Sequence, residues 1–96
     1  MKQKAIETKI IVKKRVHELK LLTEYFLNVS SGEKNFEIRF NDRDYRVGDV
    51  LILKEFDKEI GLTGRYVYRE ITYIIDHPDY VKEGFIVMGM KNLEVR

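Results

Sequence analysis

The sequence predicts one small α+β domain, mainly β, in which five to six strands form a closed or nearly closed barrel with one helix inserted early. A chain of 96 residues can bury one hydrophobic core and not two. The spacing of apolar residues changes from a helical period to a period of two after Gly32, so strands dominate the rest of the chain. Closing these strands into a barrel would remove the exposed sheet edges of a lone small sheet.

The first third of the chain is expected to contain a strand and then the helix. Residues 8–12 end in a β-branched cluster that indicates a short strand or a lead-in, and residues 16–22 alternate as a strand does. Thr23 suits a helix N-cap and Gly32 suits a helix end. The expected buried faces of strand and helix hold His17, Leu19 and Leu21, and then Leu22, Tyr25, Phe26 and Val29.

The remaining elements follow from alternation and from turn residues. In the strand at 36–40, Phe36, Ile38 and Phe40 share the face assigned to the core, which leaves Glu37 and Arg39 on the other face. A turn at 41–48 follows, then a strand at 50–56, a polar hairpin or loop at 58–64, a long strand at 65–75 and a last strand at 84–91.

Charge divides the chain into residues 1–15, a basic arm or extra strand, and residues 16–96, the domain proper. The first twenty residues hold seven lysines and arginines against two glutamates, whereas the remainder holds eleven against fourteen acids. A basic arm can neutralise phosphates and attract nucleic acid. A solvated terminus or a protected edge strand explains the same residues equally well.

Several classes of protein are not expected. The absence of cysteine excludes disulfides and thiolate chemistry, and no apolar run reaches signal-peptide or membrane-spanning length, so we expect a cytoplasmic protein without a membrane partner. The two histidines, His17 and His77, lie sixty residues apart, which gives a metal site little support. No cofactor motif appears, and oligomeric state stays open.

The candidate chemistry lies between Gly32 and Arg46. Lys34 leads into the strand that carries Glu37 and Arg39, which lie about 7 Å apart on one face. Charges that are partly covered cost free energy unless paired, so they are candidates for a site. An ordinary polar strand face is the competing interpretation.

Five further residues are secondary candidates for ligand contact. In the turn, Arg43 and Arg46 could reach a phosphate and Tyr45 could stack on a base, although Asp–Arg pairing inside the turn explains the same charges. His17 is interpreted as a satisfied histidine near the cleft or as a ligand contact. Lys20, in the same strand, joins the candidates for binding.

An ordered series of motifs resembles a small uncharacterised bacterial and phage family of the PUA-like superfamily, close to the ASCH domains. The motifs are HELK at 17–20, YF at 25–26, GxKxFEIR at 32–39, NDRDYxVGDxLIL at 41–53 and GFIVM at 84–88. The resemblance implies a PUA-like barrel with a helix beside a cleft, in a superfamily whose members mostly bind RNA. It places Lys34, Glu37 and Arg39 in that cleft, as contacts for a phosphate or a base.

The same resemblance offers an alternative, an ASCH-type amidohydrolase acting on acylated cytidine-like nucleosides. Such enzymes resemble this chain in the lysine, here Lys34, but have a threonine where this chain has Glu37, and a later acid for which Glu70 and Glu83 are distant candidates. A lysine nucleophile must lose its proton, and a neighbouring carboxylate opposes that loss. RNA binding is therefore the leading hypothesis, with a hydrolase second and a protein-interaction module third.

Overall fold

A computed structural model describes residues 14–93 and shows five strands and one helix. In chain order these are β1 (Val16–Leu22), α2 (Thr23–Ser30), β2 (Phe36–Phe40), β3 (Val50–Asp57), β4 (Gly61–Ile75) and β5 (Phe85–Asn92). The mainly β fold with one early helix is confirmed, with five strands in residues 14–93. The strand or lead-in expected at 8–12, and most of the basic arm, lie outside the described residues.

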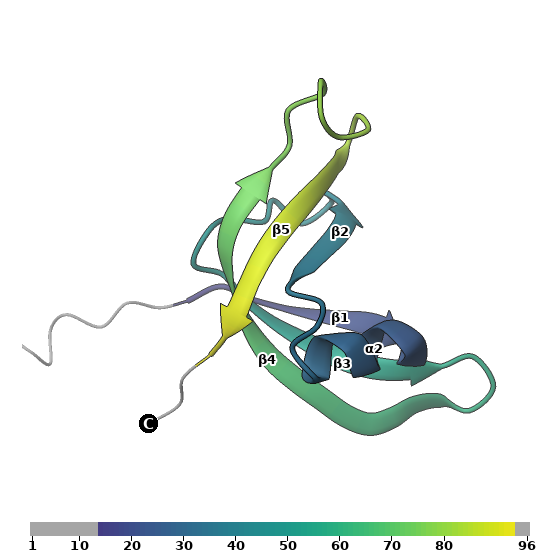
Figure 1. Cartoon of the computed structure of the whole chain (residues 1–96). Helices are drawn as coiled ribbons and strands as arrows, with labels where there is room; N and C mark the ends of the chain where they lie inside the picture. Colours follow the sequence, from purple (N-terminus) through teal and green to yellow (C-terminus); the bar gives the residue numbers. More distant parts are fainter. Residues whose placement is uncertain (1–13, 94–96) are drawn as a thin grey trace, which may run out of the picture.

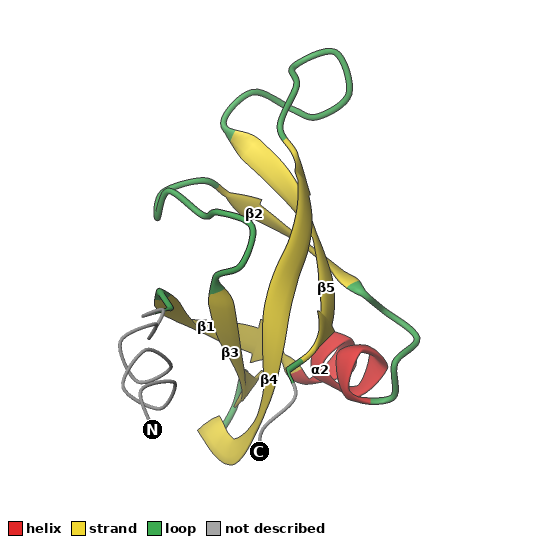
Figure 2. Ribbon diagram, turned by 90° about the vertical axis from the view of Figure 1, so that its left-hand side faces the viewer, coloured by secondary structure: helices red, strands yellow, loops and turns green. Residues whose placement is uncertain are grey.

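The five strands form one curled sheet in the order β1-β3-β4-β5-β2. The fifteen-residue strand β4 joins its halves: its first part pairs with β3 and its last part, after residue 68, pairs with β5. Figures 1 and 2 show β4 bending as it passes from one half to the other. The sheet is therefore a half-barrel, whose two edge strands are β1 and β2.

Arginine side chains bridge the two edges where a backbone ladder would close a full barrel. Arg39 of β2 donates from Nη2 to the carbonyl oxygen of Lys20 at 3.0 Å, and Arg43 donates from Nη1 to the carbonyl oxygen of Glu18 at 3.0 Å. Both acceptors belong to the outer edge of β1, which pairs with β3 on its other side. The guanidinium groups thus satisfy edge carbonyls and hold β1 near β2.

The core lies inside the curl and under the helix. Leu19 and Leu21 of β1 are buried as predicted, and they pack with Phe26 and Val29 of α2. The rest of this cluster comes from the other strands and the 41–49 turn: Tyr45, Leu51, Leu53, Ile71, Ile86, Met88 and Met90.

Two details of the predicted helix are wrong. Thr23 is the first helical residue, so the N-cap position falls to Leu22. The leucine side chain has no hydrogen-bond acceptor, and no side chain caps this end. Tyr25, assigned to the buried face, is 44% exposed and lies beside the pocket described below. The predicted end is confirmed: Gly32 has φ of 88° and its N–H donates to the carbonyl oxygen of Val29.

The turn between β3 and β4 is shorter than expected. Residues 61–64, assigned to a polar loop, belong to β4. The Asp57 side chain accepts the N–H groups of Glu59 and Ile60, at 2.8 and 3.1 Å, so that a tight turn needs few residues.

A buried carboxylate fastens this hairpin. Glu55 is 1% exposed and accepts two hydrogen bonds from Arg65, at 2.7 and 2.9 Å, and one from the Thr63 hydroxyl at 2.6 Å. The Arg65 guanidinium, with the Thr63 hydroxyl, lowers the pKa of Glu55 to about 2. Arg65 also lies over the ring of Phe26, so this ion pair connects the hairpin to α2.

Replacing Glu55 with glutamine is expected to make stability less sensitive to acid. The pKa of about 2 lies below the ordinary 4.5, so the carboxylate stabilises the fold above about pH 4.5 and this contribution disappears as the pH falls toward 2. Urea unfolding followed by circular dichroism should show Glu55→Gln less stable at neutral pH, with a flatter loss in acid. Glu33→Gln, an exposed carboxylate, is the control. An unchanged slope in Glu55→Gln would contradict the prediction.

Candidate ligand-binding site

The faces of β2 are the reverse of those predicted from alternation. Glu37 is 2% exposed and points into the curl, whereas Phe36, Ile38 and Phe40 are 43%, 56% and 56% exposed. The pairing with β5 explains the inward face, because Glu37 lies opposite Met88, which is fully buried. The strand is amphipathic as expected, but its charged face is the covered one.

Two cations neutralise the buried Glu37, one for each carboxylate oxygen. Lys34 Nζ lies 2.5 Å from Oε1, and Arg39 Nε donates to Oε2 at 2.9 Å. Side chains of Lys34 and Arg39 remain 19% and 24% exposed, so both cations reach the boundary between interior and solvent. Glu37 thereby orients the two cations.

These residues line a pocket of about 570 Å³ in the gap between the two sheet edges. This volume is within the range of small-molecule sites. One wall comes from β1 and the start of α2, and the other from residue 34 and β2. The lining residues are Lys20, Leu21, Leu22, Tyr25, Lys34, Phe36, Glu37, Ile38 and Arg39.

Aromatic rings surround the lysine of the pocket. Lys34 Nζ lies 4.9 Å from the ring centre of Phe36 and 5.9 Å from that of Tyr25, and it donates to the carbonyl oxygen of Phe36 at 2.7 Å. Both rings are more than two-fifths exposed. The pocket therefore combines cations with aromatic faces. Tyr25 and Phe36 are not predicted as pocket residues from sequence, because their helical and period-two spacing assigns both to the core.

The turn after β2 does not form the base-stacking surface that the sequence suggested as one possibility. Tyr45 is 5% exposed, and burial raises the pKa of its hydroxyl, so a base could not stack on it without opening the turn. Arg46 pairs with Asp44 at 2.7 Å, which is the internal pairing considered as the alternative. Arg43 bridges to β1, and neither arginine lines the pocket.

His17 is a satisfied core histidine and does not line the pocket. Its Nε2 lies 2.8 Å from Oδ2 of Asp49, and its ring packs edge-on against Tyr45 with centroids 4.8 Å apart. Asp49 also accepts the N–H of Arg46 at 3.0 Å, so these contacts fasten the 41–49 turn to β1. Of the two interpretations of His17, the structure shows the satisfied histidine, which supports the turn and is not among the residues that line the pocket.

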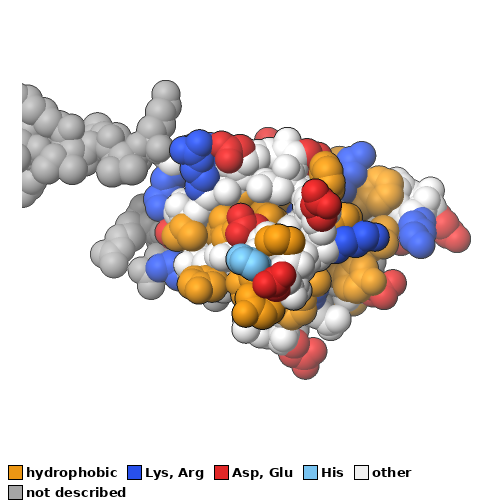
Figure 3. Space-filling view, turned by 90° about the horizontal axis from the view of Figure 1, so that it is seen from above, with side chains coloured by type: hydrophobic (Ala, Val, Ile, Leu, Met, Phe, Trp, Pro, Cys, Tyr) orange, Lys and Arg blue, Asp and Glu red, His pale blue; other side chains and the backbone are white. Residues whose placement is uncertain are grey.

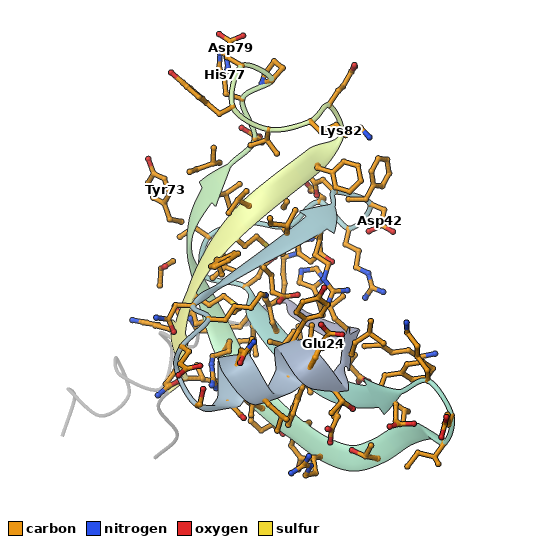
Figure 4. The ribbon with its side chains drawn as sticks, turned by 45° about the vertical axis from the view of Figure 1, so that its right-hand side comes forward. Glu24, Asp42, Tyr73, His77, Asp79 and Lys82 are labelled. Carbon is orange, nitrogen blue, oxygen red and sulfur yellow. The ribbon has the colours of Figure 1, made fainter. Side chains whose placement is uncertain are left out.

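A second hollow, of about 540 Å³, lies at the far end of the sheet. It is lined by Tyr73, Ile74, Ile75, Asp76, His77 and Tyr80. Figure 4 shows His77 and Asp79 at the tip of the loop before β5, well away from Glu24 on α2. Seen from above in Figure 3, this end carries hydrophobic side chains with acids and bases interspersed. The lining of this second hollow includes Asp76 but no lysine or arginine. It therefore suits an anionic ligand less well than the first pocket, which is lined by lysine and arginine.

Two classes of site find no support in residues 14–93. No group of three or more histidine or acidic side chains is arranged to hold a metal ion within this range. Across the same residues, α2 included, no helix has both the length and the apolar character needed to cross a membrane.

Comparison with known proteins places the chain in a family. The family described as a domain of unknown function (DUF3850) matches residues 16–90, and the chain belongs to it. Over 69 residues, 72% of the chain, it is 41% identical to an uncharacterised 12.9 kDa protein in the GpA 3′ region of Escherichia phage P2. The matched stretch covers 62% of that relative's length.

Glu37 and Arg39 are expected to be energetically coupled. Removing one partner leaves a buried charge exposed to an apolar interior, so Arg39→Gln should lower the free energy of unfolding by about 3 kcal/mol. In a double-mutant cycle with Glu37→Gln, the coupling should be about 1–3 kcal/mol in urea unfolding. Asp44→Asn with Arg46→Gln forms the control cycle, because this pair is solvent-exposed and should show no resolvable coupling. Additive losses at Glu37 and Arg39 would contradict the described ion pair.

Proposed function

We propose that this DUF3850-family domain binds RNA, or a nucleotide-like ligand, in the pocket between β1 and β2. The observation that carries the proposal is the convergence of Lys34 and Arg39, beside Lys20, on a hollow with aromatic walls. Two cations, Lys34 and Arg39, face one carboxylate, so the pocket retains an excess of positive charge, while Lys20 lines the pocket with its Nζ 5.0 Å from the ring centre of Phe56. Cations that contact phosphate beside aromatic faces that stack on bases are typical of single-stranded nucleic-acid binding.

Arg39 and Lys34 are suited to different parts of such a ligand. The planar Arg39 guanidinium is held by Glu37 and by the Lys20 carbonyl, so its remaining N–H groups are pre-oriented for a phosphate or a base edge. Lys34 presents a point charge between Tyr25 and Phe36. Pre-orientation lowers the entropy lost on binding.

The PUA-like and ASCH-like resemblance supports the same location. It implies a barrel with a helix beside a cleft that the GxKxxExR segment lines. In this chain the pocket adjoins the first turn of α2 and is lined by Lys34, Glu37 and Arg39 of that segment. The resemblance thus agrees with a ligand site here, and RNA is the ligand class that it favours.

The pocket favours binding over amide hydrolysis. Lys34 donates to Glu37 and to the Phe36 carbonyl, so two acceptors already engage the side-chain nitrogen that a nucleophile would have to present to a substrate. Neither Glu70 nor Glu83, the candidates for a later catalytic acid, lines the pocket. Glu70 instead pairs with Lys14 at 3.4 Å.

Replacing Lys20 with alanine is expected to weaken RNA binding about tenfold, a loss of about 1.4 kcal/mol. Lys20 is the suitable cation to remove, because it makes no bond to Glu37 and its loss strands no buried charge. Filter binding of short single-stranded RNAs across a salt series should also show the slope of log affinity against log salt fall by about one. Lys58→Ala, an exposed lysine in the β3–β4 turn, removes the same charge elsewhere and serves as the control.

Two results would contradict the proposal. One is wild-type protein that binds no RNA or nucleotide at low salt. The other is equal weakening by Lys20→Ala and Lys58→Ala, which would mean that affinity depends on overall charge and not on this pocket.

A further inference from the structure

We infer that the unpaired backbone of Ile38, on the open edge of β2, hydrogen-bonds the edge of a single nucleobase in the pocket. This inference rests on the proposed function and adds a recognition element to it. The cations would hold the phosphate of one nucleotide, while the N–H and C=O of one main-chain residue would bind its base. The predicted ligand unit is therefore one unpaired nucleotide.

The ladder between β2 and β5 shows which way the Ile38 backbone points. The Asn35 carbonyl accepts the N–H of Met90 at 3.0 Å, and at the other end the N–H of Asn41 donates to the Gly84 carbonyl at 2.8 Å. In an antiparallel pair the bonded residues alternate with residues whose backbone groups point away. Odd-numbered residues of this segment therefore bond to β5, and even-numbered residues face the open edge.

Among the three even-numbered residues, Ile38 has both groups free. The Phe36 carbonyl accepts a hydrogen bond from Lys34 Nζ at 2.7 Å, and the Phe40 carbonyl accepts the N–H of Asp42 at 2.9 Å. The hydrogen bonds of residues 14–93 give the Ile38 N–H and C=O no partner. Ile38 lines the pocket, so its donor and acceptor open onto it.

Arg39 keeps this edge accessible. Its guanidinium donates to the Lys20 carbonyl, the acceptor on β1 that faces β2. The Arg39 side chain therefore lies between the edges of β1 and β2 and keeps them apart. Lys20 to Leu22 and Phe36 to Arg39 consequently line opposite sides of one hollow. A planar group can enter between edges that are held apart in this way.

The pattern of free groups favours a base over an added peptide strand. A strand that pairs with an edge needs donors and acceptors on several alternate residues, and here the carbonyls on both sides of Ile38 are already occupied. A nucleobase needs one donor and one acceptor side by side, which its Watson–Crick edge can match. The exposed Phe36 ring and the Lys34 ammonium lie next to this edge and supply stacking and charge.

The test removes the donor without removing a ladder bond. Ile38→Pro deletes an N–H that makes no bond to β5, and proline is tolerated at such edge positions. Phe40→Pro deletes an equivalent outward N–H outside the pocket and is the matched control. Folding of each variant is checked by circular dichroism.

The probes are the four nucleoside monophosphates and ribose 5-phosphate, titrated by calorimetry. Wild type should bind at least one nucleotide about tenfold more tightly than ribose 5-phosphate. Ile38→Pro should reduce that nucleotide to the affinity of ribose 5-phosphate, whereas Phe40→Pro should keep the difference. In wild type, the nucleotide and not ribose 5-phosphate should shift the Ile38 amide proton downfield, a measurement that needs no variant.

The outcomes separate this inference from the proposed function. Equal binding of nucleotides and ribose 5-phosphate, or an unmoved Ile38 amide, would overturn base recognition at Ile38 and leave a phosphate-binding pocket. A preference for the nucleotide over ribose 5-phosphate that survives Ile38→Pro would overturn it in the same way. Failure of RNA and every probe to bind would overturn the proposed function itself.

Discussion

The described structure depends on one buried carboxylate, Glu37, and on the two cations that neutralise it. An ionised carboxylate without partners in a protein interior costs several kcal/mol, so the inward face of β2 requires Lys34 and Arg39 where they are. This requirement brings a lysine before the strand and an arginine within it to one place. The pocket is the consequence, because both cations must approach Glu37 from the solvent side.

The same arginine determines the shape of the sheet. Arg39 joins Glu37 to the Lys20 carbonyl, and Arg43 reaches the Glu18 carbonyl on the same edge of β1. Side chains of this length hold the strands close and still prevent a backbone ladder between them. The half-barrel therefore stays open along one seam, and the pocket occupies part of that seam.

Sequence patterns predicted the order of the elements and singled out Lys34, Glu37 and Arg39 as candidates for a site. They did not predict which face of β2 is inside. Residues with a single favourable environment were assigned correctly: Leu19 and Leu21 are buried, and Gly32 ends the helix. In β2, alternation favours placing the aromatic face inward, and no local signal shows that Lys34 and Arg39 would neutralise Glu37. Tertiary contacts likewise decide the surroundings of His17, whose partner Asp49 lies thirty-two residues away.

The reversed strand is itself an argument for a binding role. Leaving three large apolar side chains half exposed forfeits about 1 kcal/mol each relative to burial, and covering Glu37 requires two cations to be held in place. A sequence under selection for stability alone could place Phe36, Ile38 and Phe40 inward and leave the charges in solvent. Departures from local rules concentrate at functional sites. The arrangement is reasonable if the covered charges and the exposed strand edge contact a ligand, because then the same residues that weaken the fold supply the recognition.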